Sequence, residues 1–337
     1  MRRFAAVSWI AIPLAGVLVL SGCSSAKSDG DDLQIVANPV AAQPAVSPAV
    51  TVPPAGQVLP GGAVSAVAVD AKTSTLVVAV SQPPSLRLYD LNALASPPVN
   101  MPLYGTVSRL SVTPGRVEIA EPNPGVVQQL SLPDRTLTET KTGGKPVSSI
   151  VFGADRLVAM GAAKDIQVLP AAGPARTIGG QLYSADDVVD TGDGVVVLDR
   201  LRTAVFSVDV AGGKVGEGLR AGDGAANAVA DSYGRVLVTD ARAGALLAFS
   251  AGPLLLRQRF PVPGGVYGIA YDAKRSLAWV TLTGRNEVVG FDVRGGEPVE
   301  KYRFPTVRQP DSVGVDEQTG RVLVGSAAGE GTQVIQP

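Results

Sequence analysis

The sequence contains no histidine and a single cysteine, Cys23. The lack of histidine excludes catalytic triads with a histidine base, and it excludes zinc or iron sites with histidine ligands. Because Cys23 is the only thiol, the chain cannot form an internal disulfide, so its folded part must be held by packing alone. An enzyme built on this chain would have to use carboxylates, amines, hydroxyl groups or a bound ion.

The chain also lacks a large excess of charge of either sign. It has 29 basic and 30 acidic residues, and only Arg2 and Arg3 are charged before Cys23, which leaves a formal charge of −3 (27 minus 30) from Cys23 onward. This balance does not favour nucleic acid as a partner or a polybasic contact with a membrane.

Long apolar runs are missing except at the N-terminus, where Phe4 to Leu20 follow Arg2 and Arg3 as in a signal peptide. The run ends in Leu20-Ser21-Gly22-Cys23, and these four residues resemble the lipobox of bacterial lipoproteins. The resemblance implies a signal peptide over residues 1–22 and acyl chains, palmitate among them, on Cys23. We therefore expect an exported protein that is anchored to the outer face of the cell membrane by lipidated Cys23.

Residues 23–56 are rich in serine at first, then acidic at Asp29, Asp31 and Asp32, and then spaced with prolines among alanine and valine. A stretch of this composition buries too little apolar surface to order itself. We expect a disordered tether over residues 23–56 and a folded domain over residues 57–337. Arginine outnumbers lysine by 21 to 8, which is typical of a high-GC bacterium such as an actinomycete.

One phrase of four short strands recurs through the folded part, and it predicts an all-β chain. The apolar anchors of the first strands recur at intervals of 38 to 44 residues, at Val67, Leu110, Ile150, Val188, Ala228, Ile269 and Val313. This period and strand number predict a β-propeller with seven blades. Too few residues follow Val313 for four strands, so we expect Gln57 to Pro60 to complete the last blade beside Thr332 to Gln336.

Two stretches of this repeat are similar to known propeller families. Ala278 to Asp292 resemble the YVTN repeat, and Gly234 to Asp240 resemble the NHL repeat. The resemblance implies a platform that binds ligands or partners, with enzymes as a minority. A separate series, Asp70, Asp231, Asp272 and Asp316, falls at the end of the first strand in four blades, and we expect these carboxylates to accept hydrogen bonds from the following turns.

The loops from second to third strands and the connections between blades gather at one end of a propeller, which we call the loop face. A polar pocket for a sugar, a peptide or a small anion is predicted there; the alternative is a solvated face with local aspartate caps. Asp199 and Asp240 occupy equivalent loop starts, which favours turn formation over an acid and base pair. The candidate binding residues are Arg109, Lys145, Asp187, Asp199, Arg202, Asn227, Asp240, Arg242, Tyr267, Arg285, Asn286 and Asp311.

Two functions follow from this interpretation. The first is a non-catalytic lipoprotein, without a cofactor, whose loop face binds an envelope protein or glycan. The alternative is a lactone or ester hydrolase of the propeller type, with Ca²⁺ held at the channel mouth by carboxylate and amide oxygens. Ser65 stands where the first blade of such a hydrolase would offer a glutamate, and seven blades differ from the six of that kind. The oligomeric state is left open.

Overall fold

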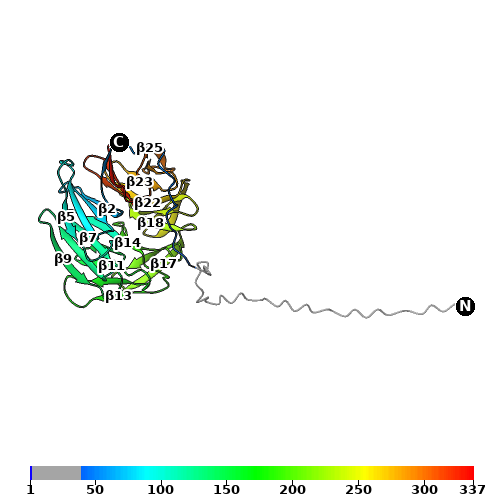
Figure 1. Ribbon diagram of the computed structural model, residues 1–337. Coiled ribbons are helices and arrows are strands. Elements are labelled where there is room, and N and C mark those ends of the chain that lie inside the picture. The colour runs from blue at the N-terminus through cyan, green and yellow to red at the C-terminus, as the bar shows by residue number, and fades with distance from the viewer. Residues whose placement is uncertain (2–38) are drawn as a thin grey trace. The chain divides into compact units, whose positions relative to one another are not determined.

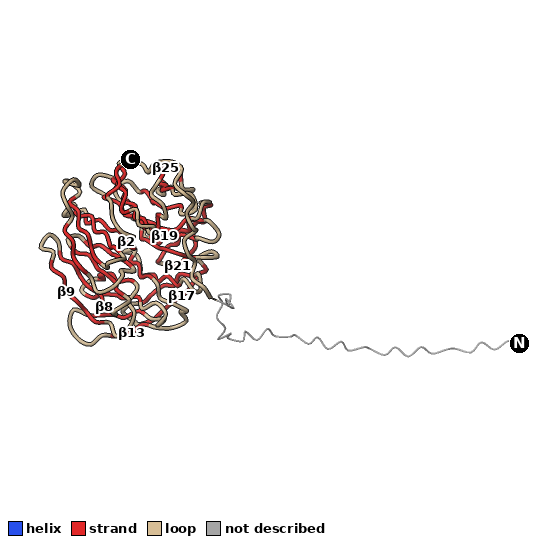
Figure 2. Tube along the Cα trace, in the orientation of Figure 1, coloured by secondary structure: helices blue, strands red, loops and turns tan. Residues whose placement is uncertain are grey.

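The computed structural model describes Met1 and residues 39–337, so Cys23 and the predicted signal peptide beyond Met1 lie outside the described residues. In the described part the chain forms twenty-eight strands and no helix (Figures 1 and 2). The strands form seven antiparallel sheets of four strands each, which confirms the predicted all-β, seven-bladed propeller. No helix that could cross a bilayer was found in residues 39–337.

Six blades are continuous in sequence. Blade one comprises β2 (Val64–Asp70), β3 (Thr75–Val80), β4 (Ser85–Asp90) and β5 (Val99–Pro102). Blade two comprises β6 (Arg109–Thr113), β7 (Arg116–Glu121), β8 (Val126–Ser131) and β9 (Thr136–Lys141). Blade three comprises β10 (Ser148–Phe152), β11 (Asp155–Ala159), β12 (Ile166–Leu169) and β13 (Arg176–Ile178). Blade four comprises β14 (Asp187–Asp190), β15 (Val195–Asp199), β16 (Ala204–Asp209) and β17 (Lys214–Arg220). Blade five comprises β18 (Ala225–Ala230), β19 (Arg235–Asp240), β20 (Ala245–Ala251) and β21 (Leu254–Pro261). Blade six comprises β22 (Val266–Asp272), β23 (Leu277–Leu282), β24 (Glu287–Asp292) and β25 (Val299–Pro305).

Position within the blade decides the composition of a strand. The second strand of blade six, β23, is buried at all six residues, because neighbouring blades pack on both of its faces. The outer strand of the same blade, β25, is exposed at its first five residues and carries Glu300, Lys301 and Arg303.

The predicted aspartate turns are confirmed; for example, Asp316 accepts the amide of Gln318 at 3.0 Å.

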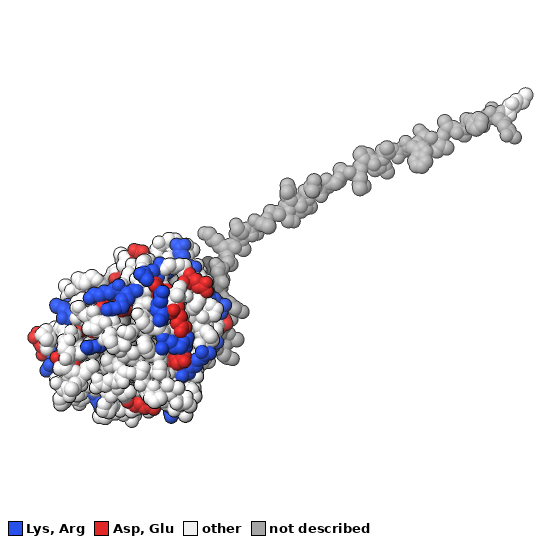
Figure 3. Space-filling view, turned by 90° about the horizontal axis from the view of Figure 1, so that it is seen from above, with Lys and Arg blue, Asp and Glu red and all other residues white. Residues whose placement is uncertain are grey.

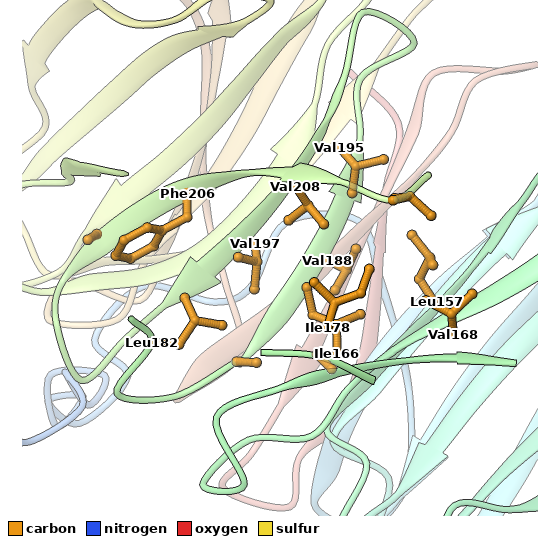
Figure 4. Close-up of a cluster of buried hydrophobic side chains, with 14 residues drawn as sticks. Leu157, Ile166, Val168, Ile178, Leu182, Val188, Val195, Val197, Phe206 and Val208 are labelled. Carbon is orange, nitrogen blue, oxygen red and sulfur yellow. The ribbon is translucent and has the colours of Figure 1, made fainter. Parts of the chain in front are cut away.

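The first strands of neighbouring blades contact one another in sequence order, and β26 (Pro310–Asp316) returns to β2 to close the ring. Apolar clusters fill the seams between blades. In the seam of Figure 4, Val197 and Phe206 of blade four share a buried cluster with Leu157 and Ile166 of blade three. The seam between blades two and three has only Val127, Val158 and Met160 in its buried cluster. The ring therefore depends on packing between blades.

The seventh blade is built from both ends of the domain. It contains β26, β27 (Arg321–Ser326), β28 (Gly331–Ile335) and, on its outer edge, β1 (Gln57–Leu59). Gln57, Val58 and Leu59 pair antiparallel with Val334, Gln333 and Thr332. The predicted closure of the ring by the segment after the tether is thus confirmed.

Residues 39–56, which we call the N-terminal strap, lie against the propeller. The structure differs here from the disordered tether predicted over residues 23–56, because side chains of the propeller satisfy the backbone of the strap. Ala42 is 1% exposed and Ser47 is 8% exposed, and Ala55 exchanges backbone and side-chain hydrogen bonds with Pro305 and Gln333. The composition of the segment shows that it has few apolar groups to bury. It does not show that propeller side chains far away in the sequence donate hydrogen bonds to its backbone.

Leu59 tests the closure. Its side chain is 4% exposed and packs in the seam between blades seven and one. We expect Leu59→Ala to lower the free energy of unfolding by about 2–4 kcal/mol, because it leaves a cavity where the two ends of the domain meet. Urea unfolding measures this loss. Val52→Ala, at a strap residue that is 57% exposed, is the control with an expected change within about 0.5 kcal/mol. Equal stability of the two variants would contradict closure by β1.

Candidate functional site at the loop face

A cavity of about 1240 Å³ follows the axis of the propeller. Its walls come from the first strands of all seven blades, with aliphatic residues such as Val67, Ile150 and Val313 along its length. The first residues of these strands lie at the loop face, so they form the mouth of the channel there. Five of the predicted residues line this cavity: Arg109, Asp187, Asn227, Tyr267 and Asp311.

Arg109 reaches from blade two to blades four and five. Its Nη2 lies 2.7 Å from Asp187 Oδ2 and donates to the carbonyl of Ala228 at 2.7 Å, while its Nη1 donates to Asn227 Oδ1 at 3.2 Å. Asn227 extends the hydrogen-bond network to blade six, because its Nδ2 donates to the carbonyl of Tyr267 at 3.1 Å. Four predicted residues from four blades therefore form one polar network at the channel mouth.

Asp187 is the anionic centre of this network. The hydroxyl of Ser148 donates to Asp187 Oδ1 at 2.5 Å, so blade three joins the network as well. Burial raises the pKa of Asp187, and the Arg109 guanidinium and the Ser148 hydroxyl oppose that shift. Since both charges are engaged with each other, the pair holds blades together rather than offering a free charge.

Arg200 lies beside this network and lines the cavity. Its backbone amide donates to Asp186 Oδ2 at 2.8 Å, and its Nη2 donates to the carbonyl of Ala42 in the strap at 2.5 Å and to Tyr267 Oη at 3.4 Å. Burial raises the pKa of Asp186, whereas hydrogen bonds from Ser184 and Arg200 lower it. Arg200 thus connects the channel mouth to the strap.

Asp311 is the one predicted carboxylate at the mouth with a partly buried side chain and a neutral partner. Gln309 Nε2 donates to Asp311 Oδ1 at 2.8 Å. Burial raises the pKa of Asp311 to about 6, and the hydrogen bond from Gln309 opposes the shift. In the described residues no three acidic, histidine or cysteine side chains are grouped closely enough to hold a metal ion.

Three predicted binding residues lie beneath the surface. Asp199 and Asp240 are fully buried, and they accept backbone amides of the preceding connection, such as Tyr183 at 2.6 Å and Gly224 at 2.8 Å. Asp199 also accepts the amide of Arg202 at 2.8 Å and Asp240 that of Ala243 at 3.1 Å, which confirms their predicted role as turn formers. Arg202 is 3% exposed; its Nη1 donates to the carbonyl of Gln181, and its guanidinium lies over the Tyr183 ring. Arg202 therefore holds a connection in place and does not present its charge at the surface.

The strap engages two further predicted residues. Arg242 Nη2 donates to the carbonyl of Val40 at 2.5 Å, and Asn286 Nδ2 donates to the carbonyl of Pro48 at 3.0 Å. Lys145 and Arg285 are the exposed residues of the predicted set that make no hydrogen bond to residues 39–56. Fewer of the predicted charged residues are free at the loop face than expected, because the strap crosses this face over blades four to seven.

The loop face of blades one to three is left open. Its exposed side chains include Tyr104, Asn123, Lys145 and Lys164, and these four residues are called the open arc. Tyr104 is 69% exposed, more than the exposed Tyr233 at 46% and Tyr302 at 39%. Sequence reasoning missed it; the signal was an aromatic residue in the short connection between blades one and two.

Hydrogen bonds join the loops that carry Tyr104, Asn123 and Lys145 into one surface. The amide of Gly105 donates to Glu121 Oε2 at 2.8 Å, and Thr142 donates its amide to Gly125 at 3.2 Å. Ser108 Oγ donates to the carbonyl of Val147 at 2.7 Å. Burial raises the pKa of Glu121, while the amides of Gly105 and Tyr104 lower it. These bonds give the exposed side chains a firm base.

Charge is mixed on the surface of the molecule. On the face in Figure 3, lysine and arginine side chains gather over one part with acidic side chains among them, and much of the remainder is uncharged. No field of one sign covers this face, in keeping with the balanced composition of the chain.

Comparison with known proteins supports the fold as a seven-bladed β-propeller. No protein-family model and no curated protein matches the sequence. Among solved structures, hydrazine synthase of Kuenenia stuttgartiensis is similar with a TM-score of 0.70 and 17% identity, covering 86% of this chain and 98% of that chain. A chain of the mitotic checkpoint complex is similar with a TM-score of 0.72 and 7% identity, covering 91% and 99%. Virginiamycin B lyase from Staphylococcus aureus is similar with a TM-score of 0.67 and 9% identity, covering 83% and 98%. Identities this low concern the fold alone, and the fold is shared by a lyase and by a component of a protein complex.

The raised pKa of Asp311 predicts a pH dependence. A folded-state pKa of about 6 exceeds the unfolded value of about 3.9, so this group contributes nothing below about pH 4 and costs stability as the pH rises through 6. We expect Asp311→Asn to raise the free energy of unfolding by about 1 kcal/mol at pH 8, after allowance for solvent screening, and to change it little at pH 4. Thermal unfolding from pH 4 to 8 measures the difference. A difference that is constant across this range would contradict the assignment.

Proposed function

We propose that this protein is a lipid-anchored, extracytoplasmic binding propeller that captures an envelope protein or glycan, without catalysis, on the open arc of blades one to three. The observation that carries the proposal is the 69% exposure of Tyr104 among exposed lysines on hydrogen-bonded loops. Tyrosine offers a large amphipathic contact at low entropic cost, and it is enriched where binding energy concentrates. Lys145 and Lys164 favour an acidic or hydroxyl-rich counterpart.

Three of the predicted carboxylates are engaged by the protein itself, which favours binding over acid and base catalysis by these groups. Asp187 is paired with Arg109, and Asp199 and Asp240 are consumed by backbone amides. A general acid or base must be free to exchange a proton with a substrate, and these groups are committed to the fold. The alternative of a calcium-assisted lactone or ester hydrolase would be favoured if Ca²⁺ at millimolar concentration raised the melting temperature.

Capture from envelope extracts tests the open arc. We expect a variant with Tyr104→Ala, Lys145→Ala and Lys164→Ala to lose at least ten-fold in partner capture, with little change of melting temperature, because these side chains are exposed. The measurement is a pull-down quantified against the native chain.

The matched control is Tyr233→Ala with Lys214→Ala and Lys301→Ala, which removes the same residue types from exposed positions away from the loop face. Loss of capture in the control, or full capture by the open-arc variant, would contradict the proposal.

Cys23→Ala tests the anchor. The lipobox-like run before Cys23 motivates it, and without a thiol no diacylglyceryl group can be attached. We expect the variant to shift from the membrane fraction to the medium or to an unprocessed precursor. Fractionation followed by immunoblotting measures the shift, with Ser25→Ala as the control that keeps Cys23. A variant that stayed in the membrane fraction at the processed size would rule out anchoring by this residue.

A further inference from the structure

The N-terminal strap is bound to the loop face as a peptide ligand is bound to a receptor. The side chains of Arg242, Arg200 and Gln309 donate to the carbonyls of Val40, Ala42 and Ala45, at 2.5, 2.5 and 3.0 Å. Loops of blades four and five and the connection between blades six and seven therefore bind the main chain of one segment.

A serine of the strap makes the most complete set of contacts. The Ser47 hydroxyl donates to the carbonyl of Thr283 at 2.6 Å and accepts the amide of Gln309 at 3.0 Å. The Ser47 amide donates to Gln309 Oε1 at 3.0 Å. The hydroxyl and the amide of Ser47 are thus both bonded to the propeller, at a residue that is 8% exposed.

The propeller provides a close-fitting floor under two alanines of the strap. A β-carbon added to Gly224 would lie 3.0 Å from the Ala42 side chain, and one added to Gly265 would lie 2.9 Å from the Ala45 side chain. Larger residues at these glycines would push the strap away from the surface. Ala42 is 1% exposed, so its own position accepts only a small side chain.

Two valines of the strap face solvent: Val40 is 60% exposed and Val46 is 91% exposed. Recognition therefore rests on the strap backbone, on small residues at positions 42 and 45, and on the serine at position 47. Since few apolar groups of the strap are buried, this segment belongs to the part of the domain that opens at low free-energy cost.

We propose that Arg200, Arg242, Thr283, Asn286 and Gln309 form a peptide-binding seat, which the strap occupies in the free protein and which an extended, alanine- and proline-rich segment of the envelope partner occupies in its place. That the segment comes from an envelope partner rests on the proposed function. That the seat binds an extended peptide rests on the contacts of the strap alone. The strap competes as an intramolecular ligand, at an effective concentration in the millimolar range. A partner that also binds the open arc holds its segment close to the seat, and this second contact lets the segment displace the strap.

The test uses the full chain and a labelled synthetic peptide with the sequence of residues 39–50. In one variant, Ala42→Glu with Ser47→Ala, the strap can no longer fill its seat, while the seat is unchanged. We expect this variant to bind the peptide at least ten-fold more tightly than the native chain does, because the internal competitor is gone. A peptide with the same two changes should bind at least ten-fold more weakly than the unchanged peptide. Adding Arg242→Ala and Gln309→Ala to the variant should abolish binding. Equal affinity of the variant and the native chain for the peptide would overturn the proposal and leave the strap as a brace.

A second measurement on the native chain guards against a variant that fails to fold. Hydrogen exchange of residues 39–50 should increase when the unlabelled peptide is added at millimolar concentration, because displaced amides such as that of Ser47 lose their acceptors. No increase at saturating peptide would also overturn the seat. If the open-arc variant still binds the peptide and still captures the partner as well as the native chain does, the proposed function is refuted and the peptide-binding seat is not.

Discussion

The pairing of β1 with β28 is the constraint on which the rest of the structure depends. The inner strand β26 meets β2 around the axis, and the outer strand of the same sheet comes from Gln57–Leu59, so this pairing ties the two ends of the domain together. A closed ring leaves each blade packed on both sides, so second strands such as β23 are buried throughout. The same pairing fixes the position of residue 57, and therefore the residues before it begin their path at the edge of blade seven. The strap lies on the propeller because covalent connection brings it within reach of Gln333 and then of the donors on the loop face.

A buried ion pair occurs at the blade seam that has few apolar side chains. Where a seam is well filled with aliphatic side chains, as between blades three and four, no ion pair is needed inside it. The seam between blades two and three is poorer in apolar groups, and Glu118, 2% exposed, is held there by Arg156 at 2.7 Å and by Gln129 at 2.7 Å. A buried pair of this kind contributes less to stability than apolar packing does, but it gives the buried Glu118 carboxylate a partner of opposite charge. Arg109 and Asp187 act in the same way across the channel mouth.

The sequence allowed the fold to be predicted, because a period near forty residues and the short last repeat are properties of the chain alone. Five of the predicted loop-face residues do meet at the channel mouth, since the first residues of first strands must converge in a ring. The fate of individual arginines was not predictable. Arg202 stacks over Tyr183, Arg242 binds the strap, and Arg285 is exposed, although all three occupy similar loops. Their difference depends on the neighbours that each meets in space. Order in residues 39–56 was missed for the same reason, because the partners of Ser47 lie more than 230 residues away in sequence.

The loop face is divided into two parts with different physical character. Blades one to three present an aromatic ring and lysines on hydrogen-bonded loops, a surface that is complete without any rearrangement. Blades four to seven present donors that are already satisfied by the strap, and these donors become available only when the strap leaves. Removal of the strap exposes charged groups whose hydrogen bonds must then be replaced, by water or by another backbone. An extended peptide replaces them better than a glycan does, because its carbonyls recur at the spacing that Arg242, Arg200 and Gln309 already match. Under the proposed function, the open part makes the first contact with the partner and the covered part binds it afterwards.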